Sequence, residues 1–139
     1  MDLEECYKKG FIKKININTE LIKSLIEMAD INEQTVKTAL LTKINISSYV
    51  SLAYDSLREI LEAIAISNCY KVTSHSCLGE LLKNLLKDFD YYEFDRLRYT
   101  RNGINYYGIK IDFQQGKEII NKIFNMKNSL LKKYLKDYK

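Results

Sequence analysis

The chain of 139 residues is 46% hydrophobic and 29% charged, proportions typical of a globular protein with a single core. No apolar run approaches the roughly 18 residues of a membrane span, and the acidic start at Met1–Glu5 differs from a basic signal peptide. We therefore expect no membrane association and a cytoplasmic location. The net charge of +4 is too small to indicate a nucleic-acid partner by itself.

Helix breakers are rare, with five glycines and no proline, so helices are expected nearly throughout the chain. Residues 2–9 predict a short helix that ends near Gly10. Residues 11–18 alternate apolar and polar side chains, which predicts a short extended connector.

A long helix is expected to follow the N-cap Thr19, because the apolar residues after it recur at helical spacing. The segment 30–32, Asp-Ile-Asn, predicts an interruption of this helix. The helical pattern then resumes at Val36, Ala39, Leu40 and Ile44. Asn45 or Ser47 is the expected N-cap of the next helix.

The helix that follows has one strongly apolar face and one face of mostly small residues, which allows another helix to approach closely. The apolar face comprises Val50, Tyr54, Leu57, Leu61 and Ile64. Arg58 stands three residues after Asp55 and four before Glu62, a spacing that predicts a local ion pair. The alternative is that Asp55, Glu59 or Glu62 reaches an arginine elsewhere in the chain.

Residues 67–73 predict a turn, and Thr73 or Ser74 is the expected cap of the following helix. The only histidine, His75, stands in the first turn of that helix. A structural hydrogen-bonded role for His75 competes with a catalytic one, because no nucleophile stands at a recognisable spacing from it.

The cysteines show no paired spacing, so we expect free, buried thiols in a reducing compartment. They are Cys6, Cys69 and Cys77. Together with a single histidine they do not predict a zinc site, and neither a metal nor another cofactor is expected.

Two helices complete the chain: one runs from the cap Asp90 to Gly108, and one starts at Asp112 or Gln114. Residues 113–139 carry seven lysines against two carboxylates, which indicates a solvated outer face or, alternatively, a non-specific phosphate footprint. The fold class is all-α: an antiparallel up-and-down bundle of four to six helices. The bundle forms one domain over residues 1–139, with its core at about 19–135.

Three of the four arginines, Arg96, Arg98 and Arg101, lie in the helix after Asp90, whereas lysine supplies the positive charge elsewhere. Guanidinium groups form forked bonds to carboxylate or phosphate, so this helix is expected to need that geometry. Arg101 shares an apolar stripe with three hydrophobic residues, namely Phe94, Leu97 and Ile104. A charge in such a stripe requires a carboxylate, a phosphate or a partner chain.

Three segments, in this order, resemble the HEPN superfamily, in particular its small stand-alone archaeal members. The segments are Tyr54–Ala63 (YDSLREILEA), Tyr70–His75 (YKVTSH) and Arg98–Gly108 (RYTRNGINYYG). The resemblance covers roughly residues 19–135. Its most specific part is the pair Arg-Asn followed by Tyr-Tyr-Gly in the third segment.

The resemblance implies a bundle of four or more helices that commonly dimerises through the helix bearing this motif. Many HEPN proteins are metal-independent ribonucleases whose Arg, polar residue, spacer and His face a second copy across the dimer cleft. Others are partners of minimal nucleotidyltransferases, often in toxin–antitoxin pairs, or are thought to bind nucleotides.

The chain departs from the nuclease pattern at Tyr106, which stands five residues after Arg101, where the histidine is expected. An unperturbed tyrosine has a pKa near 10, against about 6.5 for histidine, so it is a poor base at neutral pH. Loss of a general base typically costs on the order of 10²–10⁴ in rate. The motif therefore predicts an anion-binding cleft without its usual proton carrier.

We accordingly expect a module that dimerises and binds a nucleotide, RNA or a nucleotidyltransferase partner without catalysis of its own. The phosphate-binding candidates are Arg98, Arg101, Asn102 and Asn105. The dimer-interface candidates form a stripe of tyrosines at seven-residue spacing, flanked by an arginine: Tyr92, Arg96, Tyr99 and Tyr106.

Two alternatives stay open. The first is a toxin-like, metal-independent endoribonuclease in which Arg101 and Asn102 hold the scissile phosphate. Its protons would be moved by Tyr106, Tyr107 or His75. The second is a purely structural helical interaction protein, in which Arg101 forms a buried ion pair with a carboxylate of the same chain.

Overall fold

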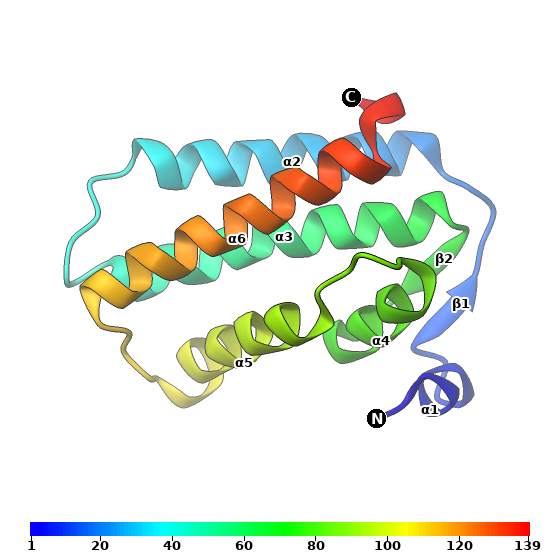
Figure 1. The fold of residues 1–139 in the computed structure, drawn as a ribbon, viewed down its shortest axis with the longest axis horizontal. Helices are drawn as coiled ribbons and strands as arrows, with labels where there is room; N and C mark the ends of the chain where they lie inside the picture. Colours follow the sequence, from blue (N-terminus) through cyan, green and yellow to red (C-terminus); the bar gives the residue numbers. More distant parts are fainter.

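Six α-helices and a two-stranded sheet make up the computed structural model, which describes residues 1–139 (Figure 1). The helices are α1 (Leu3–Lys8), α2 (Thr19–Thr38), α3 (Ile46–Ser67), α4 (His75–Leu85), α5 (Tyr91–Tyr107) and α6 (Phe113–Tyr134). The strands are β1 (Ile12–Lys14) and β2 (Tyr70–Val72), and a short 3-10 turn, Lys136–Tyr138, ends the chain. The expected all-α bundle is confirmed.

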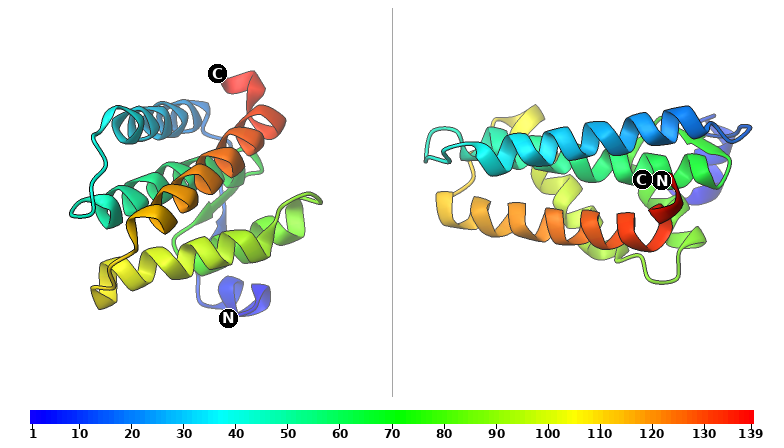
Figure 2. Two further views of the ribbon diagram at one scale, coloured as in Figure 1. Left: turned by 60° about the vertical axis from the view of Figure 1, so that its left-hand side comes forward. Right: turned by 90° about the horizontal axis from the view of Figure 1, so that it is seen from above.

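Helix α3 is the centre of the bundle, with α2 along one side, α4 and α5 along the other, and α6 crossing it (Figures 1 and 2). Its apolar face is completely buried, as the spacing of its residues predicts. The buried residues include Val50, Tyr54, Leu57, Leu61 and Ile64. Each covering helix therefore removes apolar surface of α3 from water, which is the main favourable term in folding.

A close approach of two helices is visible at Gly116 in α6. A Cβ at this position would overlap the side chain of Ile46 at the start of α3, with Val50 next to it. The hydrogen side chain of glycine thus lets the first turns of α3 and α6 pack directly against one another.

Polar side chains cap the helices where the sequence predicts most of them. Ser74, Asp90 and Asp112 each accept a hydrogen bond from a backbone N–H in the first turn of α4, α5 and α6. Gly108 ends α5 in the left-handed conformation, with φ of 65°. The cap of α2 is Asn18 rather than Thr19, because the Asn18 side chain accepts from the N–H of Leu21.

The predicted interruption at residues 30–32 is wrong, because α2 runs through them without a break. The polar residues there are part of helix packing: Asn32 donates to the Glu59 carboxylate of α3 at 2.7 Å. The helix instead ends at Thr38, earlier than the apolar pattern predicts. Leu40 and Ile44 consequently lie in a connecting loop and are 84% and 96% exposed.

The predicted turn at residues 67–73 contains a strand. β2 pairs antiparallel with β1, so that Ile12 faces Val72 and Lys14 faces Tyr70. The extended connector is confirmed at β1, but its partner lies almost sixty residues away along the sequence, where local patterns give no indication of pairing.

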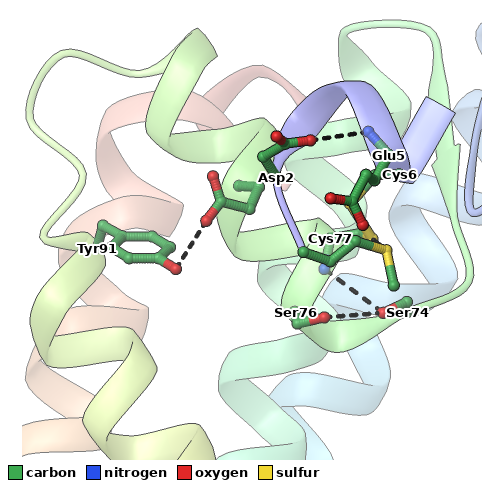
Figure 3. Close-up of a disulfide and its surroundings, with 9 residues drawn as sticks. Asp2, Glu5, Cys6, Ser74, Ser76, Cys77 and Tyr91 are labelled. Atoms are coloured by element: carbon green, nitrogen blue, oxygen red, sulfur yellow. Dashed lines mark hydrogen bonds between the residues drawn. A yellow bond between two sulfur atoms is a disulfide. The ribbon is translucent and has the colours of Figure 1, made fainter.

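The prediction of three free thiols is also wrong. Cys6 and Cys77 form a disulfide across 71 residues of sequence, with their Cα atoms 5.8 Å apart, while Cys69 is free (Figure 3). The bond forms because α1 lies against the first turn of α4, a contact that the spacing of the cysteines cannot reveal.

Every helix of the chain is too short or too polar to cross a lipid bilayer.

Candidate functional site

Helix α5 has the two distinct faces that its sequence predicts. Phe94 and Leu97 are buried against the bundle, and Ile104 packs partly against the same core. The tyrosine stripe points the other way, with exposed fractions of 69–77% for Tyr92, Tyr99 and Tyr106. One face thus fixes the helix, and the other presents aromatic rings to solvent.

Arg101 extends from the buried face of α5 toward α3. Its Nη2 lies 3.8 Å from Oδ1 of Asp55, so an acidic residue of α3 does reach this arginine, as the sequence alternative proposes. That distance is too long for a hydrogen bond. The one hydrogen bond of the guanidinium goes from Nη1 to the Tyr106 hydroxyl at 3.4 Å. Its side chain is 14% exposed, so the group is neither completely neutralised nor completely sealed.

The other arginines each bond a carboxylate on their own helix. Arg98 donates twice to Asp95, at 2.8 and 3.1 Å, and Arg96 donates to Glu93. Arg58 donates to Glu62 at 3.0 Å, which confirms the predicted local pair. Arg101 is therefore the arginine of this chain that has no hydrogen-bonded carboxylate.

Unsatisfied polar atoms gather around Arg101. The chain has four buried side-chain nitrogen or oxygen atoms without a hydrogen-bond partner within it: Tyr54 Oη, Asp55 Oδ1, Arg58 Nε and Arg101 Nε. All four belong to the contact between α3 and α5. Leaving such an atom unpaired costs about 1–3 kcal/mol, so their concentration marks this contact as a polar network that the chain does not complete alone.

A cavity of about 300 Å³ opens beside this network, between the start of α4 and α5. Its walls are Thr73, Ser74, His75 and Ser76 on one side and Arg98, Asn102 and Tyr106 on the other. A neighbouring cavity of about 420 Å³ shares Arg98, Asn102 and Tyr106 and continues to the exposed Tyr107 and to Ile109. These three α5 side chains therefore stand between two adjoining hollows.

His75 is held in its neutral form. Burial, together with the positive charges of Arg58, Arg101 and Arg98, lowers its pKa to about 4. Its ring packs 6.0 Å from the ring of the fully buried Tyr54. At neutral pH this imidazole can both donate and accept a hydrogen bond inside the cavity.

Substitution of His75 by glutamine is expected to reduce the loss of stability in mild acid. The unfolded chain protonates His75 below about pH 6.5, whereas the folded chain does so only near pH 4. The contribution of His75 to the free energy of unfolding is therefore complete above about pH 6.5. It is lost as the pH falls toward 4, because the unfolded state binds a proton that the folded state does not. Urea unfolding at pH 7.5 and pH 5 measures the difference, and an equal loss in both proteins would contradict the assignment.

The structure brings some predicted phosphate-binding residues together and separates others. Arg98 and Asn102 line the cavity, whereas Arg101 is not part of its walls and lies near Asp55 and the cavity-lining Tyr106. Asn105 is already hydrogen-bonded within the chain: the hydroxyl of Ser51 in α3 donates to Oδ1 of Asn105 at 3.0 Å. At the start of α4 only His75 was a candidate, and the contribution of Ser74 and Ser76 to the cavity was not predicted because it depends on how α4 packs against α5.

Comparisons of the chain with protein-family models, curated proteins and solved structures found no match. The likeness to the HEPN superfamily therefore stays a prediction from the motifs.

Proposed function

We propose that this chain is a HEPN-like helical module that binds the phosphate groups of a nucleotide or RNA between α4 and α5. The observation that carries the proposal is the guanidinium of Arg101, whose buried Nε has no partner and whose nearest carboxylate oxygen is 3.8 Å away. A phosphate supplies the charge and the acceptor oxygens that such a group lacks. The module has no catalysis of its own in this proposal.

The cavity beside Arg101 has the donors that a phosphate needs. Arg98 and Asn102 line it from α5, and Ser74 and Ser76 line it from the start of α4. The first N–H groups of a helix have no intrahelical partner, and the helix dipole favours an anion at this end. Asp95 already pairs with Arg98, so a bound phosphate would share this guanidinium with the carboxylate.

Homodimerisation through α5 is part of the same proposal. The tyrosine stripe, defined above by Tyr92, Tyr99 and Tyr106, exposes large aromatic surface on one side of α5. Tyrosine is enriched in protein interfaces, and contiguous apolar surface of this kind commonly marks an interaction site. Arg96 flanks the stripe and is exposed. A nucleotidyltransferase-type chain is the alternative partner for this surface, and sedimentation analysis of the purified protein distinguishes a dimer from a monomer.

The cytoplasmic location also remains a proposal. Disulfides are rare in the cytosol of most cells, although intracellular proteins of hyperthermophiles are rich in them. The Cys6–Cys77 bond is therefore compatible with a cytoplasmic protein of such an organism.

Alanine at Arg98 or Arg101 is expected to weaken binding of a labelled single-stranded RNA by roughly 10- to 100-fold, the effect of losing hydrogen bonds to a charged group. Fluorescence anisotropy at fixed salt measures the affinity, since phosphate binding depends strongly on salt. The matched control is Lys132→Ala, which removes one exposed charge from the last turn of α6. Equal affinity of Arg98→Ala, Arg101→Ala and wild type, with folds verified by circular dichroism, would count against the proposal.

A second candidate function is endoribonuclease activity with His75 as the proton carrier. It is favoured by one observation: the neutral imidazole shares a cavity with Arg98, Asn102 and Tyr106. Electrophoresis of the RNA recovered from the binding experiment tests it. Fragments that appear with wild type and disappear with His75→Ala support cleavage. Intact RNA in both samples supports a module that binds RNA without cleaving it.

A further inference from the structure

The disulfide lies at the edge of the proposed phosphate site. Cys77 is in the first turn of α4, two residues after His75, and its N–H donates to the capping hydroxyl of Ser74 (Figure 3). Ser74, His75 and Ser76 all line the cavity. The position of the Cys77 sulfur therefore bears directly on the segment that forms one wall of the site.

The disulfide is the covalent attachment of α1, which also packs Leu3 against the core and the Tyr7 ring against the Tyr70 ring. This helix has six residues, too few to be stable alone, and Cys6 is its one buried residue. Backbone hydrogen bonds continue from the helix into the sheet: the N–H of Phe11 donates to the carbonyl of Cys6, and the N–H of Thr73 donates to the carbonyl of Phe11. Met1 adds a contact between its sulfur and that of Cys77 at 3.8 Å.

We propose that reduction of the Cys6–Cys77 disulfide releases α1, loosens the first turn of α4 and thereby weakens phosphate binding. This inference rests on the proposed function. Two thiols cannot approach as closely as two bonded sulfurs, so the sulfurs separate on reduction, and we expect α1 to move away from the first turn of α4 as they do. Because α1 lies against α4, its release exposes the first turn of α4, with the capping bond from Cys77 to Ser74, to water.

The chemistry is a thiol–disulfide exchange. A thiolate of a dithiol reductant attacks one sulfur of the pair, and the other sulfur leaves as a thiolate that takes up a proton. The second thiol of the reductant then displaces the mixed disulfide. Two electrons and two protons reach Cys6 and Cys77, and the reductant becomes the disulfide. Both cysteines are fully buried, so the attack requires α1 to lift first.

The test compares oxidised protein, dithiothreitol-reduced protein and the variant Cys6→Ser. Hydrogen exchange of the backbone N–H groups of residues 75–78 is expected to accelerate at least about tenfold in the reduced protein and in the variant. The affinity for the labelled RNA is expected to fall by roughly tenfold in the same samples, and reoxidation of the wild type restores it. The control Cys69→Ser, which removes the free thiol, is expected to behave as wild type in both redox states.

Unchanged exchange at residues 75–78 in completely reduced protein would overturn the inference. Global unfolding on reduction, seen by circular dichroism, would also overturn it and assign the bond a purely structural role. An error in the proposed function gives a different result. In that case neither the oxidised nor the reduced protein binds the RNA, although hydrogen exchange in α4 still accelerates on reduction. That outcome would remove the effect on affinity together with the proposed function.

Discussion

Replacement of Glu33 by leucine is expected to lower the free energy of unfolding by about 3–5 kcal/mol, because it leaves a buried ammonium group without a countercharge. Lys127 of α6 donates to Glu33 of α2 at 2.8 Å, and the two side chains are only 2% and 5% exposed. The one remaining partner of Lys127 would be Asn128, at 3.4 Å. Chemical denaturation measures the loss.

The double variant Glu33→Leu/Lys127→Met separates the buried charge from simple loss of packing. It is expected to recover most of the stability, since a well-packed apolar pair replaces a buried ion pair at little cost. Glu27→Leu, at an exposed position on the same helix, is the control and should change stability by less than about 0.5 kcal/mol. A double variant no more stable than Glu33→Leu would refute the explanation.

The same ion pair predicts a pH dependence. Burial raises the pKa of Glu33, but hydrogen bonds from Lys127 and Lys37 outweigh burial and hold the pKa below its usual 4.5. The stabilisation is therefore present above about pH 4.5 and is lost as the pH falls through the lower, folded-state pKa. The difference in stability between wild type and Glu33→Leu is accordingly expected to narrow in acid.

Replacement of Phe94 by alanine is expected to cost about 3–5 kcal/mol, the range for truncating a buried aromatic side chain. Phe94 is completely buried and stacks on Tyr54 of α3, with ring centroids 6.1 Å apart. It also meets Phe89 at 5.7 Å and fills the space above Gly79 of α4. This single ring thus joins α5 to both helices that form the candidate site.

Phe94→Leu is the graded control, because leucine keeps most of the apolar volume and should cost clearly less than alanine. Urea unfolding of both variants gives the comparison. If the alanine variant lost no more stability than the leucine variant, the packing of the Phe94 ring would not be what holds α5 against the bundle.

Local patterns predicted the parts of the fold that depend on neighbouring residues. The apolar face of α3, the caps Asp90 and Asp112 and the left-handed end at Gly108 each follow from a few adjacent side chains. The two faces of α5 follow from helical periodicity in the same way. Two of the candidate phosphate-binding residues, Arg98 and Asn102, line the cavity.

Long-range contacts explain what the sequence did not reveal. Asp30–Asn32 suggested a break in α2, but Asn32 and the adjacent Glu33 bond other helices from inside a continuous helix. The meeting of His75 with Arg98 needs α4 to pack against α5. The disulfide likewise needs α1 to reach the first turn of α4, which no local spacing encodes.

The covalent bond between Cys6 and Cys77 encloses the loop that carries the exposed Leu40 and Ile44. A protease that cuts this loop therefore produces two peptides that stay joined as one molecule. On a non-reducing gel the nicked protein would migrate as an uncut chain, and only a thiol would separate the fragment with α1 and α2 from the fragment with α3 to α6.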